Sequence, residues 1–336
     1  MASDLISIGL SVMDYLFLCD ELPRGRFGGA ADHLVQGGGL AATAAVAMAR
    51  LGASVEMWSR VGDDLQGRFI LEQFQAEGVD TSQVRVCPGG RSSACAVTVD
   101  RSSGERYFTY FPGSGLDASL DGLDLGRVDR AEAVLVDCSW PEAQIAAARR
   151  ARERGVPVCA DVGGVGEAVR ELLSHVDYPI YSQACARHYG GTGSLEGDLA
   201  KLAELGGKVP MVTLGADGCA WLEPEDRQQK TDDSPRTSGS PLPTAVSRRP
   251  SAVGRPPTVF RRLPAFSVEV VDTTGCGDVF HGAFTYGLAQ GWDVARNARF
   301  ASAVAALKCR ALGGRTGIPS RAEVEAFLRQ RGASGE

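Results

Sequence analysis

A glycine-rich loop followed by an aspartate stands in the last quarter of the chain. A β-branched run leads into Gly275, Cys276 and Gly277, and Asp278 then opens a run of small residues typical of a helix. Unpaired N–H groups at a helix N-terminus bind anions, and glycines let a phosphate approach the backbone closely. An aspartate beside a bound phosphate can accept the proton of an attacking hydroxyl. The loop therefore suits phosphoryl transfer, although a plain glycine turn with an N-capping aspartate has the same short pattern.

Helices and strands elsewhere in the chain must position this loop. Their sequence patterns predict an α/β fold. Short apolar runs typical of buried parallel strands alternate with Ala-rich helical patterns. Strands are expected at 5–10, 133–137, 156–161 and 209–214, and helices at 41–51, 66–77, 142–154, 195–205, 278–289, 294–307 and 321–329. The alternation predicts a doubly wound, mostly parallel sheet flanked by helices.

Two segments depart from this alternation. Residues 92–112 alternate polar and apolar side chains around a turn, which predicts a hairpin, and we expect residues 14–35 to complete a small β-sheet lid with it. Residues 225–262 are rich in Pro, Ser and basic side chains. Because they offer little apolar surface to bury, we expect a disordered insertion between strands near 219–222 and 265–270.

Composition limits the classes of function. The 336 residues carry 35 Lys and Arg against 41 Asp and Glu, so a net charge of −6 gives no electrostatic case for nucleic acid or an anionic membrane as partner. The length and the 44% hydrophobic content fit a single domain over residues 1–336 that binds a small molecule. Nine cysteines without a CxxC pair, and an N-terminus without a basic region, predict a cytoplasmic protein with reduced thiols.

Two longer motifs carry a family resemblance. The segment DTTGCGDVFHGAF, residues 272–284, resembles the C-terminal signature of the ribokinase-like (PfkB) carbohydrate kinases. The segment VQGGGLAATAAVAMARLGASVEMWSRVGDDLQG, residues 35–67, resembles the glycine motif, helix and turn near the N-terminus of that family. Within the family, these motifs look most similar to bacterial sulfofructose kinases. The resemblance implies a ribokinase-like fold and ATP-dependent phosphorylation of a sugar, with Mg²⁺ as cofactor.

The resemblance implies roles for the loop residues and their neighbours. Asp278 matches the catalytic base of the family, and Gly275, Cys276 and Gly277 match its anion hole. Asp272 and Thr274 match positions that help bind a monovalent cation, such as K⁺, in several members. For these two residues, turn formation and helix capping explain the sequence equally well.

Further matches concern ATP and Mg²⁺. Thr213, Gly215 and Gly218 resemble the nucleotide-phosphate turn of the family, although they also read as a strand-to-turn junction. Ala305 and Lys308 match the region near adenine, or else belong to a core helix. One position departs from the family, because Gln183 stands where a glutamate organises hydrated Mg²⁺. A neutral amide binds Mg²⁺ less strongly than a carboxylate does, so we expect lower metal affinity.

On the sugar side, the resemblance implies that Asp14 hydrogen-bonds sugar hydroxyls and that Gly38 and Gly39 border the same pocket. Tyr110 stands where sulfofructose kinases place an asparagine that helps bind the sulfonate. Ser139 stands where they place an arginine that also helps to bind it. Arg26, Arg91 and Arg106 in the lid are the candidates to supply that charge.

Three functions remain open at the level of sequence. We expect a kinase for a sugar, with a ketohexose or another fructose-like sugar as the first guess. A nucleoside kinase of the same fold would use an aromatic base pocket, and a ligand-binding protein on a kinase scaffold would not need Asp278 for its function. Because exposed strand edges invite pairing, we also expect a homodimer through the lid.

Overall fold

The structure is a computed structural model of the whole chain. It describes residues 5–22, 28–102, 106–164, 166–225, 244–249 and 258–333. Arg26, a predicted substrate contact, lies outside the described residues, as do 226–243 and 250–257 of the predicted insertion.

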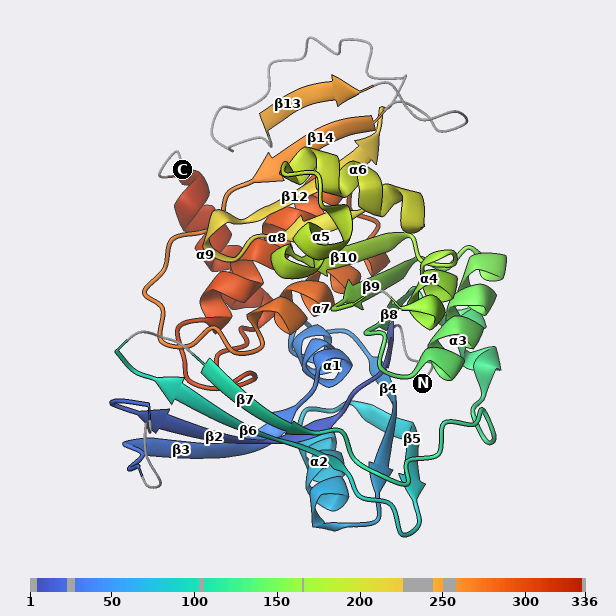
Figure 1. Cartoon of the computed structure of the whole chain (residues 1–336), viewed down its shortest axis with the longest axis vertical. Coiled ribbons are helices and arrows are strands. Elements are labelled where there is room, and N and C mark those ends of the chain that lie inside the picture. Colours follow the sequence, from blue (N-terminus) through green and yellow to red (C-terminus); the bar gives the residue numbers. More distant parts are fainter. Residues whose placement is uncertain are drawn as a thin grey trace.

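Within these residues, ten strands form one sheet in the order β13-β14-β12-β11-β10-β9-β8-β1-β4-β5 (Figure 1). Seven of them are mutually parallel: β1 (Leu5–Ile8), β4 (Val55–Gly62), β5 (Asp80–Cys87), β8 (Ala133–Val136), β9 (Val158–Val162), β10 (Tyr178–Ser182) and β11 (Met211–Thr213). The other three continue the sheet antiparallel: β12 (Cys219–Pro224), β13 (Thr244–Arg249) and β14 (Thr258–Leu263). The predicted parallel sheet is confirmed.

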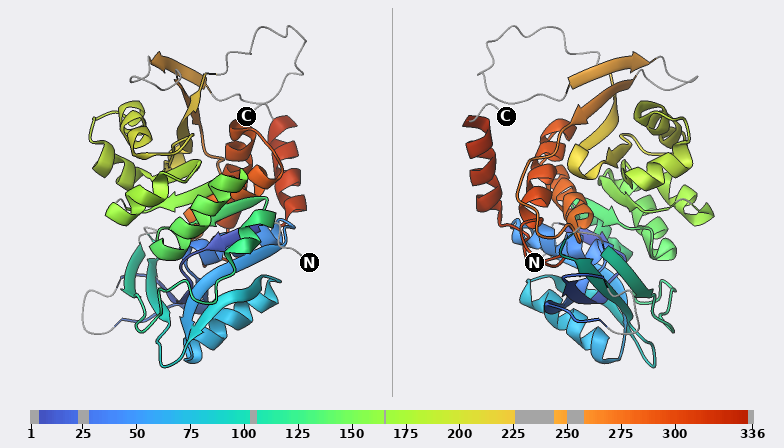
Figure 2. Two further views of the ribbon diagram at one scale, coloured as in Figure 1. Left: turned by 90° about the vertical axis from the view of Figure 1, so that its right-hand side faces the viewer. Right: turned by 60° about the vertical axis from the view of Figure 1, so that its left-hand side comes forward.

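Helices cover both faces of this sheet, as Figure 2 shows. One core lies under α1 (Leu40–Arg50), α2 (Leu65–Ala76), α7 (Cys276–Ala289), α8 (Val294–Lys308) and α9 (Arg321–Ala333). The second core lies under α3 (Pro141–Arg154), α4 (Glu167–Leu173), α5 (Gln183–Gly190) and α6 (Leu195–Leu205). Strand residues that point alternately to the two faces feed both cores, which explains why these strands read as continuous apolar runs.

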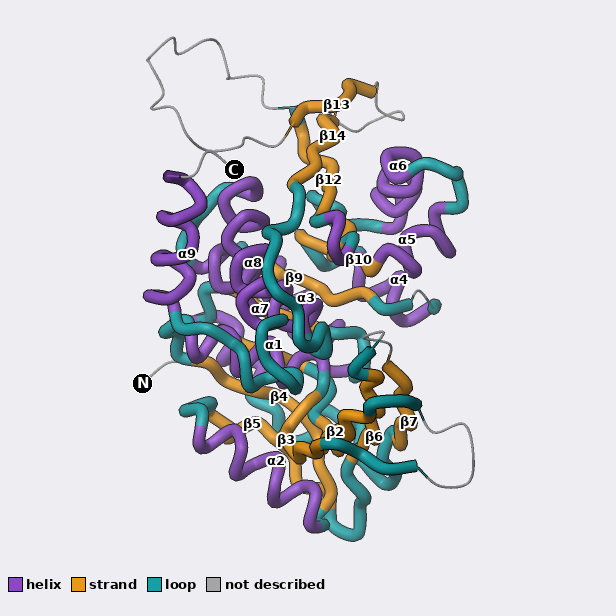
Figure 3. The backbone as a smooth tube through the Cα atoms, turned by 90° about the vertical axis from the view of Figure 1, so that its left-hand side faces the viewer, coloured by secondary structure: helices purple, strands orange, loops and turns teal. Residues whose placement is uncertain are grey.

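A separate four-stranded sheet forms the lid. Its strands are β2 (Val12–Cys19), β3 (Asp32–Gly38), β6 (Ser93–Asp100) and β7 (Arg106–Phe111), in the order β3-β2-β6-β7. The chain passes from the end of β1 directly into β2, so the lid lies at the carboxyl ends of the parallel strands. Figures 1 and 3 show the small sheet projecting from the main body beside α2.

Small residues bring α1 and α7 close together. A Cβ atom at Gly282 would lie 2.5 Å from the main-chain oxygen of Ala44, so only glycine allows this separation of the helices. The neighbouring face of α1 is built from fully buried alanines. This close packing joins the helix that follows the glycine motif of the lid to the helix that begins at the predicted phosphate loop.

Two sequence predictions around the insertion are wrong. Residues 244–249 and 258–263 form β13 and β14, although the whole range 225–262 was expected to lack structure, and residues 265–270 form no strand. The β-branched and aromatic residues Thr258–Phe260 pair with β12, and this pairing outweighs the Pro- and Arg-rich composition around them.

A helix that crosses a bilayer needs about 20 predominantly apolar residues. None of the helices in the described ranges combines the length and the apolar character that crossing a bilayer requires.

Candidate active site

Polar side chains, among them the predicted Gln183 and Thr213, gather at the carboxyl edge of the parallel strands. Asp137 follows β8, Asp161 lies near the end of β9, Gln183 follows β10, and Thr213 ends β11. Ligands of open α/β sheets bind at this edge, outside the carboxyl ends of the strands. The lid closes the same edge from the side of β1.

Asp278 lies in the first turn of α7, directly after Gly275–Gly277. Burial raises the pKa of its carboxyl well above the ordinary range, and the negative charge of Asp161 raises it further. Asp14 from the lid and Asp137 from the main sheet act in the same direction. These acidic side chains from separate elements therefore surround one space, and a carboxyl with a raised pKa is a better proton acceptor once ionised.

Asp161 and His281 meet beside Asp278, and the sequence pattern alone assigned a role to neither. Nδ1 of His281 lies 2.6 Å from the carbonyl oxygen of Gly277 and 3.4 Å from Oδ2 of Asp161. Nε2 of His281 is buried with no hydrogen-bond partner among the described residues. The usable signal was that Asp161 ends a buried strand run, where parallel sheets place functional side chains.

The sequence patterns also gave no role to Asp137. Both oxygens of its carboxylate accept hydrogen bonds. One oxygen accepts hydrogen bonds from the backbone N–H of Leu10 at 2.7 Å and of Ala41 at 3.1 Å. The other accepts from the hydroxyl of Ser139 at 2.6 Å and the side-chain amide of Gln144 at 2.9 Å. Asp137 thus fixes the chain between β1 and the lid, together with the first turn of α1.

The turn before the phosphate loop is held by Asp272. Its Oδ1 accepts from the N–H and the hydroxyl of Thr274, and its Oδ2 accepts from the N–H of Gly313 at 2.8 Å. Gly275 has a φ of 71°, and a Cβ there would lie 2.9 Å from the Cα of Gly314. Because only glycine fits this conformation and spacing, the loop has one defined path onto α7.

Lys308 was predicted to lie near adenine, but its ammonium group is directed elsewhere. The side chain is fully buried, and Nζ donates a 2.9 Å hydrogen bond to the main-chain oxygen of Asp272. Burial lowers the pKa of Lys308, and the charge of Asp272 opposes that effect. A buried positive charge therefore lies at the turn that leads into the phosphate loop.

Cys276, the middle residue of this loop, contacts a second cysteine. Its thiol lies near that of Cys309, which follows the last residue of α8. The interaction with Cys309 lowers the pKa of Cys276 against the opposing effect of burial. The sequence pattern gave no sign of the contact, because 33 positions separate the two residues.

The lid presents one row of side chains across its four strands. Asp14 pairs in register with Gln36 on β3 and with Cys95 on β6, and Cys95 pairs with Tyr110 on β7. Residues in register across neighbouring strands point to the same face. A Cβ at Gly313 would lie 2.9 Å from the amide oxygen of Gln36, so this face turns toward the loop after α8.

Gly38 makes room for Asp14. A Cβ atom at Gly38 would lie 1.8 Å from Oδ2 of Asp14. At Gly39, φ is 99° and a Cβ would lie 2.3 Å from the main-chain oxygen of Leu10. The two glycines therefore permit a close approach between the glycine motif and β2, and they lie beside Asp14 as the resemblance implied.

A buried arginine lies next to this wall. Nη2 of Arg315 donates a 3.2 Å hydrogen bond to the main-chain oxygen of Gly38, whereas Nε and Nη1 have no hydrogen-bond partner among the described residues. Burial lowers the pKa of Arg315 to about 10 and raises that of Asp14 to about 6, and the opposite charges of the two groups counteract both shifts. Arg315 therefore supplies positive charge near the predicted sugar-binding carboxylate.

The predicted nucleotide turn follows β11. Thr213 ends the strand, a single 3-10 turn spans Gly215–Asp217, and Gly218 has a φ of 90°. The side chains of Cys219 and Ser302 lie near each other, which brings the next strand close to α8, one turn before the partly buried Ala305. The turn and this part of α8 are thus brought together.

Gln183 begins α5, and its side chain is partly buried. Within the ranges that the structure describes, no group of three or more His, Cys, Asp or Glu side chains is arranged so that it could hold a metal ion. Any Mg²⁺ at this edge would need its remaining ligands from water and from the phosphates of ATP.

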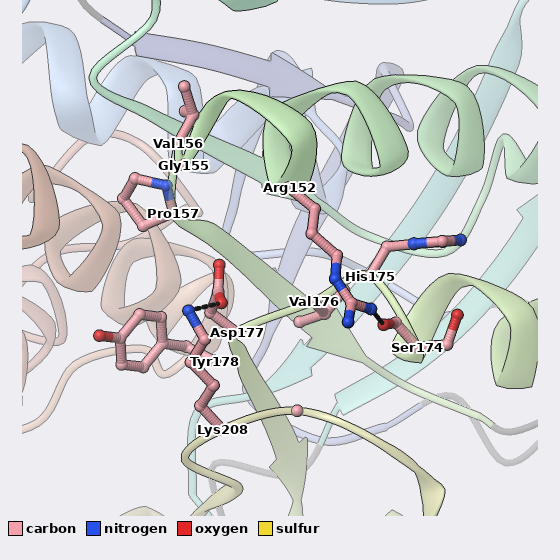
Figure 4. Close-up of a pocket in the computed structure, with 11 residues that line it drawn as sticks. Arg152, Gly155, Val156, Pro157, Ser174, His175, Val176, Asp177, Tyr178 and Lys208 are labelled. Carbon is pink, nitrogen blue, oxygen red and sulfur yellow. Dashed lines mark hydrogen bonds and ion pairs between the residues drawn. The ribbon is translucent and has the colours of Figure 1, made fainter.

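A well-defined cavity of about 280 Å³ lies elsewhere. It is lined by Arg152, His175 and Lys208 near the amino ends of β9 and β10, where Lys208 pairs with Asp177 at 2.6 Å (Figure 4). None of the predicted site residues lines it, so this cavity is separate from the candidate active site.

Comparisons with known proteins agree with this architecture. Residues 2–239 and 252–321 match the pfkB family of carbohydrate kinases. Over 333 residues the chain is 26% identical to the ribokinase of Bacillus subtilis, covering 96% of this chain and 98% of that one. It is 29% identical over 314 residues to the aminoimidazole riboside kinase of Salmonella typhimurium, covering 87% of each chain.

The fold is also found among solved structures. The structure of Arabidopsis thaliana ribokinase complexed with ribose and ATP superimposes with a TM-score of 0.77 at 24% identity, covering 98% of this chain and 99% of that chain. The ribokinase-like fold expected from the motifs is confirmed, and so is the expectation of a sugar kinase that transfers phosphate from ATP. From the matched residues and the two relatives, the chain belongs to the pfkB family of carbohydrate kinases.

Proposed function

We propose that the protein transfers the γ-phosphate of ATP to a hydroxyl of a ketohexose or a related fructose-like sugar, with Asp278 as the general base. The observation that carries this proposal is the position of Asp278 in the first turn of α7, beside the loop of Gly275, Cys276 and Gly277 and among three other acidic side chains.

In the proposed reaction, Asp278 takes the proton of the sugar hydroxyl as its oxygen bonds to the γ-phosphorus. The bond from that phosphorus to the β–γ bridging oxygen breaks, and ADP leaves with the electron pair. The N–H groups of Gly275–Gly277 stabilise the negative charge on the transferring phosphoryl group. Asp14 and the wall of Gly38 and Gly39 orient the sugar, and the lid excludes water.

Thr213, Gly215 and Gly218 are proposed to hold the nucleotide phosphates, and Ala305 is proposed to border the adenine. Mg²⁺ would arrive with ATP and neutralise phosphate charge. Gln183 can orient its bound water through the side-chain amide.

A monovalent cation at Asp272 and Thr274 does not fit these residues. Both side-chain oxygens of Asp272 accept hydrogen bonds from Thr274 and Gly313, and the ammonium group of Lys308 binds the main-chain oxygen of Asp272. We therefore propose that Lys308 supplies the positive charge at this turn and that K⁺ is not required.

The choice of a ketohexose rests on the motifs that resemble sulfofructose kinases. Tyr110 lies on the same lid face as Asp14. Arg315 provides a buried guanidinium near Asp14, whereas the sequence had suggested Arg26, Arg91 or Arg106 for this charge. A sugar with an anionic substituent would be compatible with this charge.

A nucleoside kinase is the second candidate. The 29% identity to the aminoimidazole riboside kinase of Salmonella typhimurium favours it, because the name of that relative describes a ribonucleoside-like substrate. Phe108 and Tyr110 on β7 are about half exposed, lie on the lid face that carries Asp14, and could stack on a base.

The opposite face of the lid, where Tyr107 on β7 is exposed, supports a homodimer. Phe17 on β2 and Val35 on β3 are also exposed, so the small sheet presents apolar surface over several strands. A second copy of the lid would cover such a surface and the free edge of β7.

The experiment is a measurement of ADP formation from ATP and Mg²⁺ with pentoses, ketohexoses, sugar phosphates, sulfofructose and nucleosides as acceptors. We expect the highest kcat/KM with a fructose-like sugar. Preference for a nucleoside would support the second candidate. ATP binding without turnover on any acceptor would contradict both and favour a ligand-binding protein.

A further inference from the structure

Two thiols lie together at the phosphate loop. The helices α7 and α8 are joined by residues 290–293 and lie side by side in Figure 1, so the end of α8 returns to the start of α7. Cys276 is the first residue of α7, and Cys309 follows the last residue of α8. Each of the two thiols changes the pKa of the other, so the two side chains lie close together. No disulfide links any of the nine cysteines, all of which the structure describes.

The backbone holds this pair in place. The main-chain oxygen of Cys309 accepts hydrogen bonds from the N–H of Val271 at 2.8 Å and of Asp272 at 3.1 Å. The end of α8 is therefore tied to the turn that runs into Cys276. Since the sulfur atoms of a disulfide lie about 2.05 Å apart, two thiols that these backbone hydrogen bonds hold near each other need only a local movement to be joined.

The two cysteines differ in their exposure to solvent. Cys276 is partly exposed, whereas Cys309 is buried. Among the other cysteines, all within described segments, Cys138 alone is also partly exposed. An oxidant in solution therefore reaches Cys276 before Cys309, and Cys309 is in position to react with the oxidised sulfur.

We propose that Cys276 and Cys309 form a reversible disulfide bond that switches off the phosphate loop. A peroxide supplies the oxidising equivalents. The Cys276 sulfur attacks one peroxide oxygen, the O–O bond breaks, and a sulfenic acid and one water form from hydrogen peroxide. The Cys309 sulfur then attacks the Cys276 sulfur, the S–O bond breaks, and a second water leaves. Two thiols are thus oxidised to one disulfide while hydrogen peroxide is reduced to two waters.

The disulfide would alter the loop that binds phosphate, and this consequence rests on the proposed function. Drawing Cys276 toward α8 displaces the N–H groups of Gly275–Gly277, which are proposed to stabilise the transferring phosphoryl group. A 1 Å displacement of such groups is enough to cost roughly 100-fold in rate. A nucleotide bound on the loop would cover Cys276 and slow its oxidation.

The test is peptide mapping by mass spectrometry without reduction, after the purified protein is treated with hydrogen peroxide. We expect a linked pair of peptides that contain Cys276 and Cys309, with less linkage when ATP is present. ADP formation should fall in step with the linkage and return after treatment with dithiothreitol. Because linkage is measured directly, a failure of the proposed kinase activity would not be mistaken for a failure of this inference.

Two variants sharpen the test, each compared with its own untreated activity. Cys309→Ser cannot form the disulfide, so we expect its oxidation at Cys276 to proceed to acids that dithiothreitol does not reverse. Cys138→Ser should keep both the linkage and the reversible loss of activity. The inference is overturned if Cys276 is oxidised without linkage to Cys309, or if the loss of activity in Cys309→Ser is as reversible as in the wild type.

Discussion

Oδ2 of Asp161 lies 3.4 Å from Nδ1 of His281, three residues along α7 from Asp278. Burial raises the pKa of Asp161, the charge of His281 counteracts this effect, and Asp137 adds to it. Asp161 is also the strongest charged influence on Asp278. Asp161 at the end of β9 thus interacts electrostatically with Asp278 at the start of α7, and this interaction raises the proton affinity of the proposed base.

Replacement of Asp161 by Asn should move the acid limb of the kcat/KM profile to lower pH. The negative charge of Asp161 raises the pKa of Asp278, so its removal lowers that pKa. The ionised base then persists to lower pH. Profiles for the wild type, Asp161→Asn and the surface control Asp129→Asn would measure this. An acid limb that stays in place or moves upward in Asp161→Asn would contradict the assignment.

Replacement of Gly38 by Ala should weaken sugar binding. The new Cβ would lie 1.8 Å from Oδ2 of Asp14 and would displace that carboxylate. We expect the KM for the sugar to rise about tenfold or more, a loss of about 1.4 kcal/mol, with little change in the KM for ATP. Gly29→Ala is the matched control in the same lid, because a Cβ there meets nothing within 4 Å. Equal increases in both KM values would argue against a sugar-side position.

Replacement of Lys308 by Met should destabilise the turn before the phosphate loop. The main-chain oxygen of Asp272 would lose its buried donor, which costs about 1–3 kcal/mol in the free energy of unfolding. We expect wild-type turnover to be insensitive to K⁺, and turnover of the variant to be lower and partly restored by K⁺. The exposed Lys201→Met serves as control. A wild type that needs K⁺ would show that Lys308 does not replace the cation.

Replacement of Gln183 by Glu should lower the Mg²⁺ concentration that turnover requires. A carboxylate attracts and orients hydrated Mg²⁺ more strongly than an amide does. At fixed ATP, we expect half-maximal turnover at a Mg²⁺ concentration lower than that of the wild type. Gln75→Glu, an exposed change on α2, controls for net charge. An unchanged Mg²⁺ dependence would place Gln183 away from the metal.

Local patterns predicted much of this molecule. The loop of Gly275, Cys276 and Gly277 before Asp278 was predictable because a glycine run and the start of a helix are adjacent in sequence. The parallel sheet was predictable because its buried strands are short, uninterrupted apolar runs. The separate small sheet followed from the alternation around residues 92–112.

Contacts between distant elements could not be predicted in the same way. The meeting of Asp161 with His281 depends on the order of strands and on the packing of α7. The direction of Lys308 depends on which face α8 turns to the Asp272 turn, and the pattern of a core helix does not say which group a buried lysine binds. The pairing of β14 with β12 supplied the stabilisation that its Pro- and Arg-rich surroundings concealed.

The most direct test of the central claim compares Asp278→Asn with the wild type and with Asp129→Asn. The measurements are kcat for ADP formation with the best acceptor and the Kd for ATP. Loss of a general base predicts a fall in kcat of at least roughly 100-fold. The Kd for ATP should remain within a few-fold of the wild type, because Asp278 acts on the sugar hydroxyl. Turnover of Asp278→Asn close to that of the two comparison proteins would contradict the proposal that Asp278 is the base.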